Sequence, residues 1–484
     1  MIKFFNRERE MAELDAFLER ERAQLIGVYG RRRVGKTTLL TTWAARTGLP
    51  VLYWVAKRDP KQALMAGLAR TLWVWEHGGE PEEISIQPRS WEDVFQMMAR
   101  AIGNRRVIVI LDELPYALQQ DGGFASHIQA AWDHLFKDSN VLLFLSGSHI
   151  GMMVDLLTYQ APLYGRFTAQ LPLLPLSFPD IRDFLPRYDV YKRLAVYAIL
   201  GGIPAYLERW DDSETIAANV QRLFLQRTGW FRNEPLVLIS DLTRRESASF
   251  EAILRALATG NHTREDIAAA SAITSPSLSH YLPRLIELNL VERRIPATVP
   301  LQQRRTSRLS RYYLSDPYLR FYYRFIDPNL HLIEQGLVGR LWHKMEGNFR
   351  AFVALTFEEL CRAWTLAQAR TDRLPFAPDV VGSHWATDVQ VDVVAIAWRE
   401  RRILLGECKW GMEDVGRSVV RELVEEKTPR VLAVLSDRGK GWAVHYAFFA
   451  RTGFTEAAGA EAARHNAILV NLANIERDLR HLSP

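Results

Sequence analysis

The chain has 484 residues, of which 48% are hydrophobic and 24% charged, and its formal net charge is +5. This balance is typical of globular proteins and excludes a largely disordered chain. No apolar run reaches the ~18 residues of a membrane span, and the first residues lack the apolar stretch of a signal peptide. The two cysteines, Cys361 and Cys408, exclude a disulfide framework and a thiolate zinc site. We therefore expect a cytoplasmic protein of roughly three or four domains.

The first part of the chain alternates short apolar runs with helical stretches. The runs expected to form strands are 24–29, 51–55, 107–111 and 141–145. They are apolar throughout and bounded by turns or charges, which is typical of strands buried on both faces of a parallel sheet. The helical stretches between them are 37–46, 60–76, 91–102 and 123–137. Strands alternating with helices in this way predict a βαβ domain.

Residues 30–37, GRRRVGKT, fit the phosphate-loop pattern G-x-x-x-x-G-K-[ST]. The motif follows an expected strand and precedes an expected helix, so backbone N–H groups and the helix N-terminus would surround nucleotide phosphates. Lys36 would reach the β- and γ-phosphates, and the Thr37 hydroxyl would ligate Mg²⁺. The nucleotide-binding residues expected here are Gly30, Val34, Gly35, Lys36, Thr37 and Thr38. The alternative is a glycine-rich turn that only opens a helix.

The apolar run 107–111 ends in Asp112 and Glu113, which would lie at the edge where open α/β sheets bind ligands. Asp112 would hold Mg²⁺ through water, and Glu113 would orient or deprotonate the attacking water. A solvated acidic pair at a strand end is the alternative. The next apolar run ends in Ser146-Gly147-Ser148, where Ser148 would sense the γ-phosphate or the water, or would only form a turn.

Several motifs occur in an order that resembles a known family. They are Phe5-Asn6-Arg7-Glu8 with Glu10, the phosphate loop, the Asp-Glu strand, Ser-Gly-Ser, Pro162-Leu163-Tyr164-Gly165-Arg166 and Gly201-Gly202-Ile203-Pro204. This order resembles the prokaryotic P-loop ATPases related to the signal-transduction ATPases with numerous domains. The resemblance covers most of the chain and implies that Arg7 and Glu8 lie near the nucleotide base and that Pro204 packs near adenine. It also implies that Arg166 senses phosphate, a role that suits a guanidinium, although a surface salt bridge is the alternative for this arginine.

Residues 247–327 have the order of elements of a winged helix. The expected helices are 249–257, 264–270 and 275–288, and the expected strands are 290–293 and 311–314. The side chains expected to contact DNA are Ser277, His280 and Arg284 on the recognition helix and Arg304, Arg305 and Arg308 in the wing. Pro283 lies inside the recognition helix and favours a kink. A winged helix that serves as a spacer or a protein-docking module is the alternative.

Near the C-terminus, two apolar runs around a short charged turn predict a β-hairpin, 391–398 with 403–410. Glu407 and Lys409 share one face of the second strand, and Asp392 would lie opposite one of them. Charged groups in apolar strands are costly to bury unless they are paired or bound to metal. Two carboxylates and a lysine are the groups that metal-assisted phosphodiester cleavage needs.

The surrounding elements resemble the restriction-endonuclease-like fold with its PD-(D/E)xK signature. They are an upstream helix near 346–364, the hairpin, a helix at 413–426, a strand at 431–436 and a further helix. By this resemblance Asp392 and Glu407 would hold Mg²⁺, or Mn²⁺ in its place, and Glu358 would join them, with Glu359 as the competing choice. The first strand has Gln390 and Val391 before its acid where the signature has Pro-Asp. An inactive domain that binds nucleic acid or acts as a scaffold is therefore the alternative to an active nuclease.

The sequence as a whole predicts an α/β multidomain protein. Its expected parts are a parallel-sheet P-loop ATPase core (1–179), a helical lid (180–246), a winged helix (247–327) and a restriction-endonuclease-like domain (328–484). The expected function is a Mg-ATP-binding and hydrolysing switch ATPase that controls a DNA-directed, metal-dependent nuclease-like domain. The alternative is an ATP-switched DNA-binding regulator or interaction scaffold with a silent nuclease fold. The expected partners are ATP and DNA, without a membrane; a second copy of the chain and an unidentified protein are further candidates.

Overall fold

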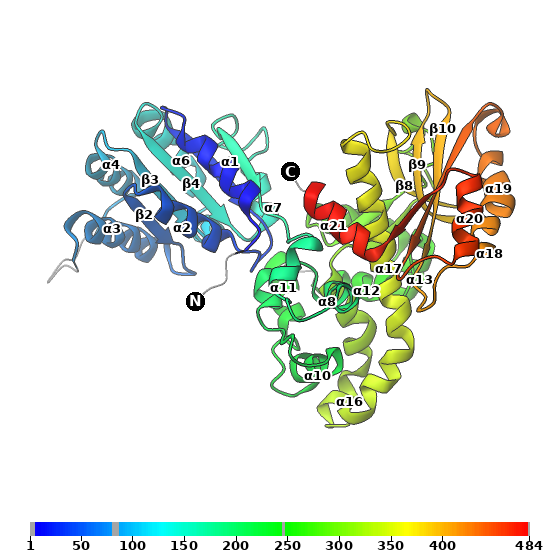
Figure 1. Cartoon of the computed structure of the whole chain (residues 1–484). Coiled ribbons are helices and arrows are strands. Elements are labelled where there is room, and N and C mark those ends of the chain that lie inside the picture. Colours follow the sequence, from blue (N-terminus) through cyan, green and yellow to red (C-terminus); the bar gives the residue numbers. More distant parts are fainter. Residues whose placement is uncertain (1–4, 80–86, 244–246, 483–484) are drawn as a thin grey trace. The chain divides into compact units, whose positions relative to one another are not determined.

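The computed structural model describes residues 5–79, 87–243 and 247–482, which form two compact units (Figure 1). The first unit consists of the chain up to residue 176 together with 203–206. The second consists of 177–202 and of the chain from 207 onward. Each unit has a five-stranded sheet of its own, so the expected α/β multidomain fold is confirmed.

The sheet of the first unit has the strand order β2-β3-β4-β1-β5, and all its neighbouring strands are parallel. The strands are β1 (Gln24–Tyr29), β2 (Val51–Val55), β3 (Val107–Asp112), β4 (Val141–Gly147) and β5 (Ala169–Pro172). The first four coincide with the expected apolar runs, whereas β5 was not expected. Because β4 lies between β1 and β3, the chain leaving β4 emerges between the phosphate loop and the Asp-Glu pair.

Helices cover both faces of this sheet. They are α1 (Glu8–Leu18), α2 (Lys36–Thr47), α3 (Lys61–His77), α4 (Trp91–Ile102), α5 (Leu114–Gln120), α6 (Phe124–Ala131) and α7 (Ile150–Asp155). A short π-helical turn, η1 (Trp132–Phe136), continues α6. Helix α4 begins at a capping box, in which the Ser90 hydroxyl accepts from the N–H of Asp93 and the Asp93 carboxylate accepts from the N–H of Ser90.

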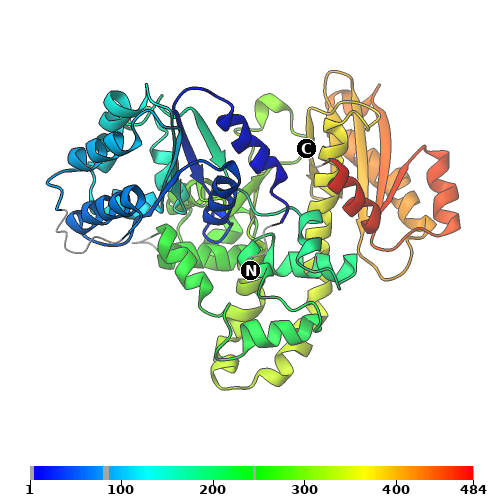
Figure 2. The same cartoon turned by 60° about the vertical axis from the view of Figure 1, so that its left-hand side comes forward.

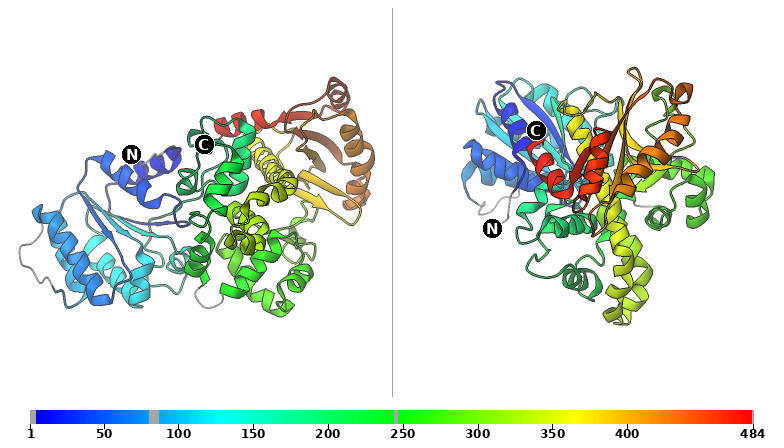
Figure 3. Two further views of the ribbon diagram at one scale, coloured as in Figure 1. Left: turned by 90° about the horizontal axis from the view of Figure 1, so that it is seen from below. Right: turned by 45° about the vertical axis from the view of Figure 1, so that its right-hand side comes forward.

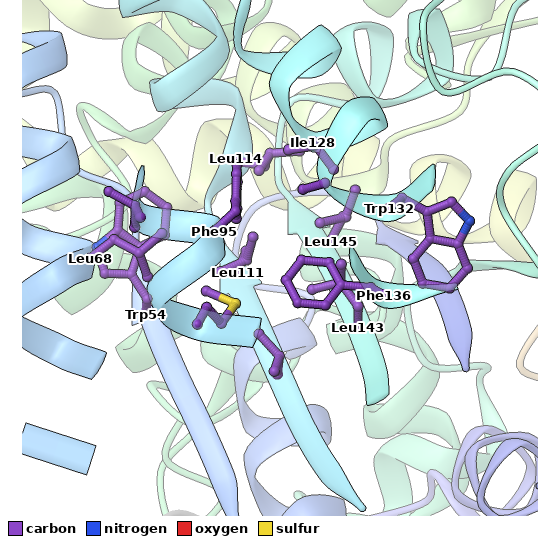
Figure 4. Packing of buried hydrophobic residues seen from close by; sticks show 14 of the residues in the cluster. Trp54, Leu68, Phe95, Leu111, Leu114, Ile128, Trp132, Phe136, Leu143 and Leu145 are labelled. Atoms are coloured by element: carbon purple, nitrogen blue, oxygen red, sulfur yellow. The ribbon is translucent and has the colours of Figure 1, made fainter. Parts of the chain in front are cut away.

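Side chains of alternate positions on the strands form the core on the face that α3, α4 and α6 cover. Figure 4 shows Leu111 of β3 and Leu145 of β4 close to Phe95 of α4 and Phe136 of η1, all of them buried. On the opposite face, Trp43 of α2 packs edge-on against Phe144 of β4, with ring centroids 5.4 Å apart. Strands β1, β3 and β4 are thus buried on both faces, as parallel strands between two helical layers must be, whereas the edge strand β2 is only partly buried.

The second unit begins with helices and a small hairpin. Its α-helices up to residue 334 are α8 (Val190–Leu200), α10 (Ile216–Val220), α11 (Glu234–Thr243), α12 (Ser247–Ala258), α13 (Arg264–Ser271), α14 (Ser275–Glu287), α15 (Pro317–Phe321) and α16 (Leu330–Glu334). The short α9 (Pro204–Leu207) joins the two units. Strands β6 (Val291–Arg294) and β7 (Arg311–Leu314) pair antiparallel after α14. Helix α14 buries Leu278, Leu282 and Leu285 and continues through Pro283.

The C-terminal sheet has the order β12-β11-β10-β9-β8. Its strands are β8 (Val380–Trp385), β9 (Gln390–Ala397), β10 (Arg402–Lys409), β11 (Ala443–Ala450) and β12 (Ile468–Asn471). Strands β8, β9 and β10 pair antiparallel, whereas β10, β11 and β12 pair parallel. The long helix α17 (Leu341–Arg370) packs on β8, β9 and β10, and Figure 2 shows it running along the sheet.

The remaining helices of this domain are α18 (Arg417–Arg421), α19 (Thr428–Ala433), α20 (Glu456–Arg464) and α21 (Leu472–Leu482). Helix α21 follows β12 and packs against α17 and α8; it is the red helix near the C-terminus in Figure 3. In the part of the chain that the structure describes, no helix is both long and apolar enough to cross a membrane.

The expected strand at 431–436 is wrong, because its first residues belong to α19. Val431 is buried, whereas Ala433 and Val434 are exposed, so the run is buried on one side only, as in a surface helix. The strand that follows is β11, and β8 was not expected. A short apolar run cannot be assigned to strand or helix by periodicity alone.

Candidate functional site

The phosphate loop has the tight backbone that its glycines allow. Gly35 has φ +100° and Arg33 has φ +68°, both in the left-handed region. A Cβ on Gly30 would lie 2.3 Å from the carbonyl oxygen of Leu173, so no side chain fits there. The Lys36 ammonium is buried and donates to the carbonyl oxygens of Gly30, at 3.0 Å, and Arg31, at 3.3 Å. The Lys36 ammonium therefore lies inside the loop, where the phosphates of a bound nucleotide are expected.

Arg7 holds the phosphate loop by hydrogen bonds to the backbone. Its guanidinium is buried and donates to the carbonyl oxygens of Val34 at 3.0 Å and Leu174 at 2.9 Å, and it pairs with Glu10 at 2.6 Å. Glu8, the first residue of α1, is exposed. The geometry thus gives Arg7 a structural role in holding the loop, and contact of either residue with a nucleotide base stays a prediction.

The Asp112 carboxylate joins the loop to the end of β3. One of its oxygens accepts from the Thr37 hydroxyl at 2.6 Å and from the Tyr53 hydroxyl at 3.1 Å. The other accepts from the N–H of Glu113 at 2.9 Å. A hydroxyl and a carboxylate oxygen this close are the hard oxygen donors that Mg²⁺ prefers, so these residues fit that ion. The sequence does not predict Tyr53, because a single tyrosine on an edge strand belongs to no motif.

Glu113 lies beside the end of β4. Its backbone is left-handed, with φ +52° and ψ +38°, and it precedes α5. Its carboxylate accepts from the Ser148 hydroxyl at 2.6 Å and from the Ser148 N–H at 3.4 Å. The structure therefore brings together the two residues expected to handle the attacking water and to sense it.

Burial and nearby carboxylates act on the Lys36 ammonium in opposite directions. Burial lowers the pKa of Lys36, while Glu113 and Asp112 act to raise it. The Tyr53 phenol next to Asp112 has a raised pKa, through burial first and then through the charge of Asp112. The Lys36 ammonium thus lies near the negative charges of Glu113 and Asp112, while the nearby charge of Arg32 acts to lower its pKa further.

Arg166 is bound to Asp133 of η1 in a two-pronged ion pair, with Nε at 2.9 Å and one terminal nitrogen at 2.7 Å from the carboxylate. Its other terminal nitrogen donates to the carbonyl oxygens of Pro162 and Tyr164. The side chain is 28% exposed. A phosphate-sensing role would require release from Asp133 and stays a prediction.

The Gly-Gly-Ile-Pro segment reaches the phosphate loop through Tyr206, which follows Pro204 by two residues in α9. The Arg31 guanidinium donates to the Tyr206 hydroxyl at 3.3 Å and lies 5.5 Å from the centroid of its ring. Residues 203–206 belong to the first unit together with the loop. This places Pro204 in a segment that contacts the loop, and its packing on adenine stays a prediction.

The second set of site residues lies at the ends of β9 and β10. The Asp392 carboxylate accepts from the N–H of Cys408 at 3.0 Å. The Glu407 carboxylate, 5% exposed, pairs with the ammonium of Lys409 at 2.8 Å and with that of Lys427 at 2.8 Å. Burial raises the pKa of Asp392, and the neighbouring charge of Glu407 raises it further. Glu407 is thus paired with Lys409 and lies close enough to Asp392 for its charge to act on it, while their joint role in a metal site stays a prediction.

Glu358 and Glu359 of α17 have different surroundings. Glu359 pairs with Arg320 at 2.7 Å and Arg294 at 2.8 Å; burial acts to raise its pKa, but the two arginines outweigh it and lower the pKa to about 2. Burial and then the charge of Asp392 raise the pKa of Glu358 to about 7. Arg362 approaches Glu358 at 3.9 Å. This geometry favours Glu358, and not Glu359, as the helix acid near Asp392.

Among the residues that the structure describes, no group of three or more His, Cys, Asp or Glu side chains converges as a metal site. Glu358, Asp392 and Glu407 are therefore not assembled as three ligands, although their oxygens are of the right kind for Mg²⁺ or Mn²⁺. The Glu407 carboxylate instead accepts hydrogen bonds from the ammonium groups of Lys409 and Lys427.

The residues expected to contact DNA differ in how exposed they are. On α14, Ser277 bonds to Thr274 at 2.9 Å and Arg284 pairs with Glu287 at 2.9 Å, while the exposed His280 lies beside Tyr281. In the loop between β6 and β7, Arg305 and Arg308 are exposed, whereas Arg304 donates to the carbonyl oxygens of Ile295 and Pro296. Burial lowers the pKa of Arg304, with Arg293 adding to the effect. Arg304 therefore braces its own loop.

Two stretches of the chain match known families. Residues 4–210 match a family described as an ATPase domain predominantly from Archaea, and residues 322–421 match a family of archaeal and bacterial proteins of unknown function. The chain carries an ATPase domain of the first family followed by the C-terminal domain of the second. The resemblance to prokaryotic P-loop ATPases is confirmed, and the nuclease-like assignment stays a prediction.

Relatives span most of the chain. An uncharacterized protein of Methanocaldococcus jannaschii is 28% identical over 415 residues, which cover 84% of this chain and 87% of the relative. A Walker-type ATPase of Pyrococcus abyssi shares 22% identity at a TM-score of 0.49, covering 66% of this chain and 96% of that one. The ORC2 protein of Aeropyrum pernix shares 16% identity at a TM-score of 0.44, covering 70% and 96%.

Proposed function

We propose that this protein is a Mg-ATP-hydrolysing switch whose nucleotide state controls a DNA-directed, metal-dependent nuclease-like domain. The observation that carries the ATPase part is a series of hydrogen bonds. The Thr37 hydroxyl and the backbone N–H of Glu113 donate to the Asp112 carboxylate, and the Ser148 hydroxyl donates to the Glu113 carboxylate. In this series, the expected Mg²⁺ donor, the expected base and the expected sensor are held in contact at the ligand edge of one sheet. Each is fixed by a hydrogen bond of 2.9 Å or shorter.

The side chains would divide the work of hydrolysis between them. Lys36 would neutralise the β- and γ-phosphates from inside the loop, and Glu113 would take the proton of the attacking water, oriented by Ser148. Thr37 and Asp112 would hold Mg²⁺, which when bound neutralises phosphate charge. Tyr53 would keep the Asp112 carboxylate in place by its second hydrogen bond.

Helix α8 supports the control of the C-terminal domain by ATP. Arg193 of α8 pairs with Glu476 of α21 at 2.6 Å, and both side chains are largely buried. Arg451 lies between the rings of Tyr191 on α8, at 5.1 Å, and Trp410, at 5.0 Å. Trp410 directly follows Lys409, so Arg451 links α8 to the end of the strand that carries the nuclease-like residues.

The other end of α8 leads back to the nucleotide. The chain leaves α8 at Gly201, whose φ is +65°, and within five residues reaches Tyr206, the contact of Arg31 in the phosphate loop. A change at the phosphate loop would therefore act on a segment that continues directly into a helix fixed to the C-terminal domain. A two-state element biased at one end is what a nucleotide switch requires.

The test is incubation of supercoiled and linear DNA with Mg²⁺ or Mn²⁺, with and without ATP. Wild-type protein should cleave in a metal-dependent reaction that ATP alters. Asp392→Asn should not cleave, and cleavage by Lys36→Ala should not respond to ATP. Absence of cleavage under every condition would contradict the nuclease part.

A second candidate is an ATP-switched DNA-binding regulator with a silent nuclease fold. It is favoured by the two ion pairs that occupy Glu407 and by the absence of Pro-Asp before Asp392. In that case the same incubation would leave DNA intact, while DNA affinity would still change with ATP.

A further inference from the structure

Lys427 is a second lysine that pairs with Glu407 in the nuclease-like site. It ends the π-helical turn η8 (Glu422–Lys427), twenty residues after Glu407, and no motif pointed to it. Its ammonium lies 2.9 Å from one oxygen of Glu407 and 2.8 Å from the other. Lys409, the lysine of the signature, donates to one of these oxygens at 2.8 Å. Lys427 therefore holds Glu407 more completely than Lys409 does.

Cationic side chains surround the carboxylates of the site. Three carboxylates, those of Glu358, Asp392 and Glu407, stand against the cations of Lys409, Lys427 and Arg362. A buried carboxylate such as Glu407 must be paired, and the ammonium groups supply that pairing. A divalent cation that bound Glu407 would need the oxygen lone pairs that now accept from Lys409 and Lys427. It would also be repelled by the positive charges of these two ammonium groups.

Lys427 also has a second acceptor within reach. Its ammonium lies 3.4 Å from the carboxylate of Glu422, at the start of the same π-helical turn. The Glu422 side chain is 46% exposed, whereas that of Glu407 is 6% exposed. An ammonium that left Glu407 would therefore keep an anionic partner toward solvent, without rearrangement of the fold.

We propose that Lys427 is a tethered counter-ion that closes the metal site, so that its ammonium and a divalent cation compete for Glu407. This inference rests on the proposed metal site and names what keeps that site from converging. Metal binding then requires Lys427 to move from Glu407 toward Glu422. Lys427 is a positioning residue here, because it acts on the metal through Glu407.

The experiment measures Mn²⁺ affinity by calorimetry on the full chain, without DNA or nucleotide. Lys427→Met removes the charge at similar length and should bind Mn²⁺ at least about tenfold more tightly than wild type. Lys427→Gln keeps a hydrogen-bond donor for Glu407 but removes the charge, and it should also bind Mn²⁺ more tightly than wild type. This second variant keeps the test valid if Lys427→Met does not fold. Lys427→Arg should match wild type.

Two controls assign the effect to this site. Lys440→Met removes an exposed lysine elsewhere in the domain and should leave Mn²⁺ affinity unchanged. Adding Asp392→Asn to Lys427→Met should abolish the gain. Equal affinity of wild type, Lys427→Met and Lys427→Gln would overturn the counter-ion role and leave the metal site standing. Absence of Mn²⁺ binding in every variant would overturn the metal site itself, and the nuclease proposal with it.

Discussion

Glu113 adopts a left-handed backbone that is unfavourable for a side chain with a Cβ, at a cost of about 1 kcal/mol. Two hydrogen bonds fix this conformation. The N–H of Glu113 donates to the Asp112 carboxylate, and the Glu113 carboxylate accepts from the Ser148 hydroxyl. Strain of this kind is kept where a side chain must point in one direction. Here that direction is the ligand edge of the sheet, which supports Glu113 as the base for hydrolysis.

The roles of Lys36 and Glu113 separate in two substitutions. Lys36→Ala should abolish ATP binding, because no other side chain of the loop is expected to reach the β- and γ-phosphates. Glu113→Gln should bind ATP and hydrolyse it at least ~10²-fold more slowly, as expected for loss of a general base. Nucleotide binding and phosphate release are measured side by side, with the exposed Glu76→Gln as control. Equal hydrolysis by wild type and Glu113→Gln would show that another group activates the water.

Glu359 makes a contribution to stability that depends on pH. Its pKa is lowered to about 2 in the folded protein, so its stabilising effect is present above the ordinary value of 4.5 and disappears as the pH falls toward 2. Glu359→Gln should lower the free energy of unfolding by about 3 kcal/mol at pH 7, because it leaves Arg294 and Arg320 without their anion.

Urea unfolding of wild type and Glu359→Gln at several pH values measures this contribution. The difference between the two proteins should shrink below about pH 4 and disappear near pH 2. Glu346→Gln, an exposed substitution on the same helix, should change little at any pH. A difference that is the same at pH 3 and pH 7 would mean that the ion pairs do not stabilise the folded state.

At the scale of elements, the loop between β6 and β7 is docked on the edge strand β8. The N–H of Ala297 donates to the carbonyl oxygen of Ser383 at 2.8 Å, and the Thr298 hydroxyl bonds to His384 at 2.7 Å. The indole of Trp385 donates to the carbonyl oxygen of Leu309 at 3.2 Å. The loop thus covers an edge that would otherwise be open to pairing with another strand.

Substitutions of Arg304, Arg305 and Arg308 in this loop should therefore have two different kinds of effect. Arg305→Ala and Arg308→Ala should weaken DNA binding and flatten its log–log salt dependence by roughly one unit for each phosphate that is no longer bound. Arg304→Ala should mainly lower the free energy of unfolding, by about 1 kcal/mol for each hydrogen bond to a loop carbonyl that is lost. DNA binding is titrated over a range of salt concentrations, with the exposed Arg373→Ala as control. An unchanged slope for Arg305→Ala and Arg308→Ala would make this loop structural throughout.

The parts of the fold that the sequence predicted are those set by local pattern. Strands β1 and β2 have the expected bounds, because a short apolar run between helices in a parallel sheet has few other solutions. The run at 431–436 was assigned to a strand although its first residues lie in α19, since burial on one side depends on tertiary packing. Of the site residues, those in motifs were predictable. Tyr53 and Lys427 reach their carboxylates from elsewhere in the chain, and only the fold brings them there.

At the scale of the whole molecule, two carboxylate sites are joined by one helix in the chain. The phosphate loop contacts Tyr206, the chain continues from there to α8, and α8 is fixed to α21 by the ion pair between Arg193 and Glu476. The proposed switch uses this continuous stretch of chain to link the nucleotide to the C-terminal domain. A coupling free energy of 1–3 kcal/mol is usual for such control and corresponds to a change in affinity of about five-fold or more.

The most direct test of this account is the DNA affinity of the full chain with and without ATP, measured by fluorescence anisotropy at one salt concentration. ATP should change the affinity of wild type and of Glu113→Gln by at least about five-fold, with the longer-lived response in Glu113→Gln. Lys36→Ala should show no response to ATP. If ATP leaves the DNA affinity of all three proteins the same, or if none of them binds DNA, the nucleotide does not act as a switch on a DNA-directed domain.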